Sequence, residues 1–210
     1  MLDLAFGDEQ TSGRAIDGIR AIHTRVNGTL TESVGRFPAG TPYSAEDPAL
    51  VLWVHATLVE TMVITFEWMV GPLTTEQRDR YCSEAAWVAV ALGAHDGDIP
   101  RTWRSMREYV DHVVDGDTLA VGPHAAALGR ALMWSPLGVM LPGSGCLNRL
   151  VTAALLPPRL QHGYELPWSP RREWLARRVV RIIRGLRHIT PDGIALWASA
   201  RHLQFPARAA

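Results

Sequence analysis

The stretch from Tyr43 to Gly71 constrains the fold more than any other part of the chain, because it predicts one long apolar helix. Asp47 suits the N-cap of this helix and Pro48 its first position, while Gly71 and Pro72 end it. With 3.6 residues per turn, His55 lies at the centre of the most apolar face. The side chains expected around it on that face are Val51, Leu52, Leu58, Val59, Met62 and Phe66.

The polar side chains of the same stretch, Thr57, Glu60, Thr61 and Glu67, fall on the opposite side of the helical wheel. They form only a narrow strip, so little of this helix suits contact with water. We therefore expect a helix at about 48–70 that is almost wholly buried, with the rest of the chain packed around it.

The remaining chain shows helical periodicity in most of its segments, and no run alternates at period two for long enough to predict a strand. Gly28 is expected just after the first helix, the segment 29–45 as a loop and the segment 163–170 as a turn. We therefore predict an all-α fold, a single domain over residues 1–210 with about eight helices around a buried central helix. Besides 48–70, the expected helices are 8–27, 75–92, 100–114, 123–134, 145–156, 170–188 and 192–203.

The charge balance argues against a nucleic-acid partner. The chain has 21 basic and 21 acidic residues and a net charge of zero, and every basic residue is arginine. Seven of these arginines fall in the predicted helix 170–188, where they surround most of the wheel without a recognisable helix-turn-helix pair. We expect this helix to present a solvated face whose arginines pair with carboxylates elsewhere.

The two cysteines, Cys82 and Cys146, are far apart and match no metal-binding spacing, so we expect free buried thiols in a reducing compartment. The N-terminus lacks a secretory signal pattern. The longest apolar stretch is interrupted by His55, Glu60 and Glu67, which predicts no transmembrane segment. A cytoplasmic location is the resulting expectation.

Two histidines, His23 and His55, are the candidate functional residues, because both lie on apolar or half-apolar helix faces. Such a histidine is either a hydrogen-bonded core residue, or a ligand of iron or zinc, or a base tuned by burial. Arg20 precedes His23 by one turn, and this pair suits haem, since an imidazole binds iron and a guanidinium can reach a propionate. Gly143-Ser144-Gly145 lacks the context of a nucleophile elbow, and phosphate-binding and zinc-binding motifs are absent. The other histidines, expected at the surface, are His95, His112, His124, His162, His188 and His202.

Several stretches together resemble the family of the rubber oxygenases (latex-clearing proteins) and the fungal ER-bound MpaB oxygenase. The resemblance implies an all-α fold with haem b and, in the rubber oxygenases, cleavage of a carbon–carbon double bond by dioxygen. It matches Arg20 and His23 to the family's arginine and proximal haem ligand, and His55 to a histidine near the haem. The stretches are IRAIHTRVNG (19–28), YSAEDPALVLWVHATLVETMVITFE (43–67), GPLTTEQRDRYCSEAAWVAVALG (71–93), IP (99–100), LLPPRLQHGYELPWSP (155–170) and the arginine-rich helix that follows.

The chain departs from the family pattern in two places. Asn27-Gly28 stands where the rubber oxygenases carry an Arg-His pair. The family's N-terminal Arg-x-x-x-Thr region and its distal glutamate have no counterpart here, so we expect either a true start further upstream or an N-terminally shortened member.

The resemblance implies a haem b-dependent, oxygenase-like protein that uses dioxygen on an apolar or unsaturated small substrate, with His23 as metal ligand and Arg20 and His55 as further haem contacts. The alternative is a non-catalytic member that binds haem, a lipid or a protein partner, with a homo-oligomer as one form of association. A zinc or other non-haem hydrolase is a third reading, but His23 and His55 have no carboxylate at ligand spacing.

Overall fold

Eight α-helices dominate residues 8–133 and 144–187, the parts of the chain that the structure, a computed structural model, describes. The predicted all-α fold is confirmed, and the predicted helix 192–203 lies outside the described residues. The elements in chain order are α2 (Glu9–His23), β1 (Asn27–Thr29), β2 (Pro42–Ser44), α3 (Pro48–Met69), α4 (Thr75–Leu92), the 3-10 helix η1 (Asp96–Asp98), α5 (Trp103–Asp115), α6 (Pro123–Met133), α7 (Ser144–Leu155), α8 (Pro158–Gly163) and α9 (Pro170–Arg187).

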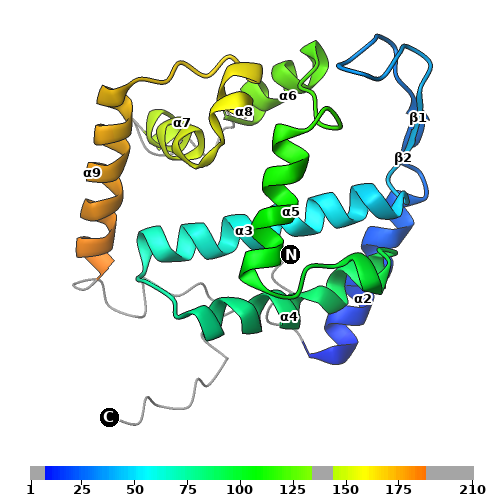
Figure 1. Ribbon diagram of the computed structural model, residues 1–210, viewed down its shortest axis with the longest axis horizontal. Coiled ribbons are helices and arrows are strands. Elements are labelled where there is room, and N and C mark those ends of the chain that lie inside the picture. Colours follow the sequence, from blue (N-terminus) through cyan, green and yellow to red (C-terminus); the bar gives the residue numbers. More distant parts are fainter. Residues whose placement is uncertain (1–7, 134–143, 188–210) are drawn as a thin grey trace.

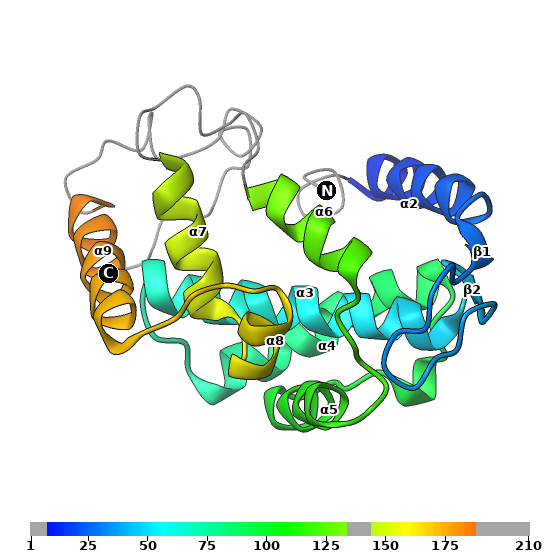
Figure 2. The ribbon, with the colours of Figure 1, turned by 90° about the horizontal axis from the view of Figure 1, so that it is seen from above.

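Helix α3 crosses the middle of the molecule, with α9 at one end and α2 and the two strands at the other (Figure 1). It packs against α4, α5 and α9, and Figure 2 shows α5 on one side of it and α6 and α7 toward the other. The expected start of α3 is confirmed, because the Asp47 carboxylate accepts a hydrogen bond of 2.9 Å from the backbone N–H of Ala49. The sequence therefore predicted both the central helix and its place in the fold.

The core forms where α3, α4 and α5 meet. Helix α4 contributes Cys82, Ala86 and Ala89, which are fully buried, and these small side chains at helical spacing let α4 approach α3 closely. Met106 and Val110 of α5 pack in one cluster with Cys82, and complete burial of a side chain such as Met106 contributes about 1.5–3 kcal/mol. This three-helix layer holds the middle of α3 in place.

The two carboxylates of α3 pair with arginines of the neighbouring helices. Glu60 is buried and accepts a hydrogen bond from Arg107 of α5, so part of the predicted polar strip faces a neighbouring helix. Glu67 accepts from Nε of Arg78 at 3.0 Å and from the backbone N–H of Leu73 at 3.1 Å, which fixes the turn into α4.

By length and composition, α3 is also the one described helix that could cross a membrane.

Helix α8 was not predicted, since a six-residue helix is too short to show a periodic pattern. Its Arg159 donates hydrogen bonds to the carbonyl groups of Val114 and Gly116, which satisfies acceptors at the C-terminal end of α5. The buried Gln161 amide donates to the carbonyl groups of Ala153 and Leu156 at 2.8 and 3.0 Å, at the end of α7. These bonds join α5, α7 and α8.

Helix α2 ends at His23 rather than at residue 27, and an antiparallel hairpin follows where a loop was expected. The Thr24 hydroxyl donates a hydrogen bond to the carbonyl of Ala21, and the Asn27 side-chain amide donates one to the carbonyl of Thr24. Polar side chains therefore bond the backbone carbonyls at the end of the helix. The register of the hairpin pairs Gly28 with Tyr43. Gly28 therefore belongs to a strand and does not cap the helix.

Candidate functional site

A cavity of about 330 Å³ lies where the end of α2, strand β2, the first half of α3 and the end of α4 meet. The polar side chains in its wall are those of His23, Tyr43, Ser44 and His55. A small number of polar groups in an apolar wall is the usual composition of a small-molecule site. The rest of the described wall consists of Val26, Ala45, Leu50, Val51, Trp53, Val54, Leu58, Val88, Ala89 and Leu92.

His55 reaches this cavity from the middle of α3, and its ring is largely buried. Its Nε2 atom is inaccessible to water and has no hydrogen-bond partner among the described residues. Burial lowers the pKa of His55, which favours the neutral imidazole, the form that can accept a proton or bind a metal.

His23 reaches the same cavity from the last position of α2. Its Nδ1 atom is also buried without a hydrogen-bond partner in the described part of the chain. A buried polar atom without a partner is costly, by about 1–3 kcal/mol, and points to a group that would complete the site. Both histidines line this cavity, one from each of two helices, so the structure brings the two predicted histidines together.

Arg20 does not join them in the cavity wall. Its side chain is exposed on α2, one turn before His23, and it makes no ion pair or hydrogen bond with another described residue. The predicted pair of Arg20 and His23 is therefore present along the helix, with only the histidine turned into the cavity.

The apolar face of α3 is buried only in part, which corrects the prediction of an almost wholly buried helix. Val51, Leu52 and Val59 are buried as expected around His55. Leu58, Met62 and Phe66 remain 45%, 58% and 43% exposed, because α4, α5 and α9 cover other sides of α3. These three belong to an exposed apolar ridge with four-residue spacing, made of Leu50, Val54, Leu58, Met62 and Phe66.

The ridge runs between two cavities. Leu50, Val54 and Leu58 line the histidine cavity, while Met62 and Phe66 line a second one of about 380 Å³ beside α4. The histidine cavity is thus open to an apolar surface rather than closed on all sides.

The donor set fits an iron held mainly by a porphyrin. No group of three or more histidine, cysteine or acidic side chains suited to a metal occurs in residues 8–133 and 144–187. Haem needs only one or two protein ligands, and apolar walls to enclose the ring. The two histidines in the apolar wall are compatible with these needs.

Residues of the hairpin were missed as site residues. Tyr43 and Ser44 enter the wall only because β2 folds back on β1, and a three-residue strand leaves no pattern in the sequence. Trp53 was also missed, because one of eight tryptophans carries no individual signal in the sequence. The four described histidines expected at the surface, His95, His112, His124 and His162, are exposed as predicted.

Comparisons with known proteins identify relatives over most of the chain. The family model described as "ER-bound oxygenase mpaB/B'/Rubber oxygenase, catalytic domain" matches residues 1–185. Uncharacterized proteins of Mycobacterium bovis and Mycobacterium tuberculosis are each 27% identical over 177 residues, which cover 80% of this chain and 65% of the relative. The chain thus spans less than two thirds of the length of these relatives. No solved structure matches the chain.

Proposed function

The chain belongs to the family of the ER-bound MpaB oxygenase and rubber oxygenase catalytic domains, and from this membership we propose that it is a haem b-dependent oxygenase acting on an apolar or unsaturated small molecule. The observation that supports haem in this chain is that His23 and His55 line one apolar cavity and that each has a buried ring nitrogen without a hydrogen-bond partner among the described residues. Bound haem would supply the iron that activates dioxygen for cleavage of a carbon–carbon double bond.

His23 is the proposed iron ligand. It ends α2, and the hairpin that follows fixes the backbone directly behind it. Arg20 lies one turn away with a guanidinium that has no carboxylate partner in the described residues, so it would be available to pair with a haem propionate. Arg20 and His23 together would hold the cofactor by its metal and by its charged edge.

His55 has a different proposed role. Because burial lowers its pKa, its imidazole is neutral at pH 7 and can accept a proton from a substrate in the cavity. No carboxylate lies in the described wall, so His55 is the proposed base. The apolar side chains around it would bind the substrate and keep water away from the reacting atoms.

Haem titration tests the proposal. Purified protein titrated with haemin should show a Soret band that saturates at one haem per chain, and His23→Ala should abolish it. His95→Ala, which removes an exposed histidine outside the cavity, should bind haem normally. His55→Ala should retain the Soret band and lose oxygen consumption with an unsaturated substrate. A wild-type protein that stays colourless with haemin would refute the proposal.

A second candidate rests on the exposed ridge of α3. Five large apolar side chains in a row, open to solvent over the length of a helix, are typical of an interaction surface. The chain would then be a non-catalytic member that binds a lipid, a partner or a second copy through this ridge. Met62→Glu tests this, since it should break such an association, measured by light scattering, without affecting haem binding.

A further inference from the structure

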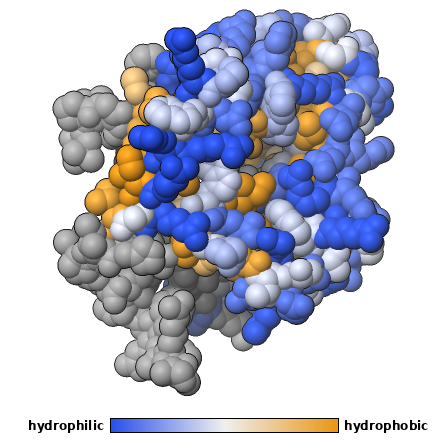
Figure 3. Space-filling view, turned by 60° about the vertical axis from the view of Figure 1, so that its left-hand side comes forward, coloured by the Kyte–Doolittle hydropathy of each residue, from blue (hydrophilic) through white to orange (hydrophobic). Residues whose placement is uncertain are grey.

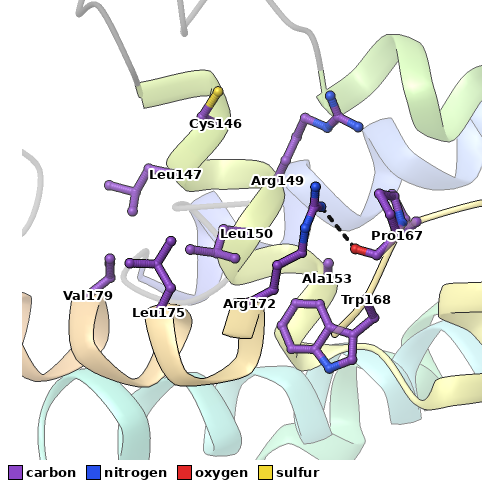
Figure 4. Close-up of a pocket in the computed structure, with 11 residues that line it drawn as sticks. Cys146, Leu147, Arg149, Leu150, Ala153, Pro167, Trp168, Arg172, Leu175 and Val179 are labelled. Carbon is purple, nitrogen blue, oxygen red and sulfur yellow. Dashed lines mark hydrogen bonds between the residues drawn. The ribbon is translucent and has the colours of Figure 1, made fainter. Parts of the chain in front are cut away.

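A different cavity lies at the other end of the molecule, between α7, the segment 166–168 and α9 (Figure 4). Its volume is about 440 Å³, within the range of small-molecule sites, and it shares no described wall residue with the histidine cavity. One end is apolar, with Leu147 of α7 facing Leu175 and Val179 of α9. This end suits a hydrocarbon chain.

The other end is cationic. Figure 4 shows Arg149 and Arg172 on the side of the cavity away from Val179, with Trp168 beside Arg172. Arg172 donates one hydrogen bond, of 2.9 Å, to the carbonyl of Pro167, and it has no carboxylate partner among the described residues. The described wall contains no aspartate or glutamate. An anion entering here would meet arginine without competition from an acidic side chain.

The charge of α9 strengthens this preference. Residues 170–187 contain seven arginines and one acidic residue, Glu173, which pairs with Arg177 of the same helix at 2.7 Å. The expected pairing of these arginines with carboxylates elsewhere is wrong for the described residues, where Arg177 alone of this helix has an acidic partner. Figure 3 shows apolar residues at the surface between hydrophilic ones on the side of the molecule that carries α9.

We propose that this cavity binds a single-chain amphiphile with an anionic head group, such as a fatty carboxylate. The carboxylate binds at Arg172, and the hydrocarbon chain lies against Leu147, Leu175 and Val179. Arginine and a carboxylate form two parallel charge-assisted hydrogen bonds, which fixes the direction of the ligand in the cavity. The proposal does not depend on haem or on the chemistry of the histidine cavity.

Calorimetric titration of the full-length protein with monomeric dodecanoate, below its micelle concentration, tests the head-group contact. Arg172→Gln should weaken binding about tenfold or more, which is the effect of losing a hydrogen bond to a charged group. Arg172→Lys keeps the charge and should restore part of the affinity. Arg181→Gln is the matched control, because it removes the same charge from an exposed position of α9 outside the cavity.

A matched pair of leucine substitutions tests the apolar end of the cavity. Leu175 lines the cavity and is 46% exposed, while Leu186 is 51% exposed and lies outside it. Leu175→Ser should weaken dodecanoate binding several-fold, and Leu186→Ser should leave it unchanged. Both changes are on the surface of α9, so circular dichroism should show the same fold in each variant.

Three outcomes would overturn the proposal. Equal affinity for dodecanoate and uncharged dodecanol would mean that the arginines do not select the head group. Equal losses in Arg172→Gln and Arg181→Gln would assign the effect to the general charge of α9. Binding to phosphatidylglycerol vesicles without binding to monomeric dodecanoate would identify a membrane-docking surface instead of a cavity for a free amphiphile.

Discussion

The ion pair between Glu60 and Arg107 predicts that replacing Arg107 lowers the stability of the fold more than replacing Glu60. Glu60 lies in the middle of α3 with its side chain 12% exposed, while Arg107 of α5 is 40% exposed and also bonds Asp111 at 3.0 Å. Burial raises the pKa of Glu60 even though the charge of Arg107 lowers it. The environment as a whole therefore disfavours the charged carboxylate.

Removing Arg107 should cost far more than neutralising Glu60. Loss of one partner of a fully buried pair costs about 3–5 kcal/mol, because a charge is left buried alone. The exposure of Arg107 lets water reach the site, so we expect about 2 kcal/mol for Arg107→Met at pH 7. Glu60→Gln removes the charge itself and should change the free energy of unfolding by less than about 1 kcal/mol.

Thermal and urea unfolding followed by circular dichroism can measure this difference. For a chain of this length, about 2 kcal/mol corresponds to a fall in Tm of about 4–8 °C for Arg107→Met. The double variant should recover most of the lost stability, since it leaves no buried charge. A larger loss in Glu60→Gln than in Arg107→Met at pH 7 would refute the reasoning.

The pH dependence gives an independent check. A carboxyl group whose pKa is raised by folding contributes stability that is complete below the pKa of the unfolded chain and is lost as pH rises through the folded value. Arg107→Met removes the main group that lowers the pKa of Glu60, so the raised value rises further. The loss of stability in the Arg107→Met variant should be greatest near pH 7 and should shrink as pH falls toward 4.5, the ordinary pKa of glutamate.

Other predictions concern the two thiols and the glycines. In native protein, a maleimide should label the exposed Cys146 quickly and the buried Cys82 only after unfolding, because burial raises the pKa of the Cys82 thiol to about 11; mass spectrometry of peptides reads this out. Gly122→Ala should lower stability by about 1–3 kcal/mol, since its Cβ would lie 2.8 Å from Cγ2 of Val34. Gly18→Ala, in an open position of α2, should raise stability by about 0.5–1 kcal/mol in the same urea unfolding assay.

Much of the fold could be predicted because helices of three or more turns leave a periodic pattern and recognisable caps. Thr74 and Gln77 form the capping box that starts α4, and Gly93 ends it in the left-handed conformation. The sequence could not show α8 or the hairpin, since neither is long enough to repeat a pattern. It also placed Cys146 in the interior, whereas this thiol is exposed on α7.

The site was predictable to the extent that each residue carries its own signal. His23 and His55 stood out as polar residues on apolar faces, and the structure places both in one cavity. Helix α3 is apolar on most of its sides, and the neighbouring helices determine which side is buried. Periodicity alone therefore could not distinguish buried Val59 from exposed Met62. The burial of Glu60 likewise depends on Arg107, which lies 47 residues further along the chain.

The contacts of α3 have a consequence for the order of folding. Its partners α4 and α5 follow it directly in the chain, whereas α9 begins a hundred residues after α3 ends, so only the first two contacts close short loops. We expect residues 48–115 to collapse first and α9 to dock late on a surface that already exists. The histidine cavity depends on the early layer, and the arginine-bordered cavity takes shape only when α9 has docked.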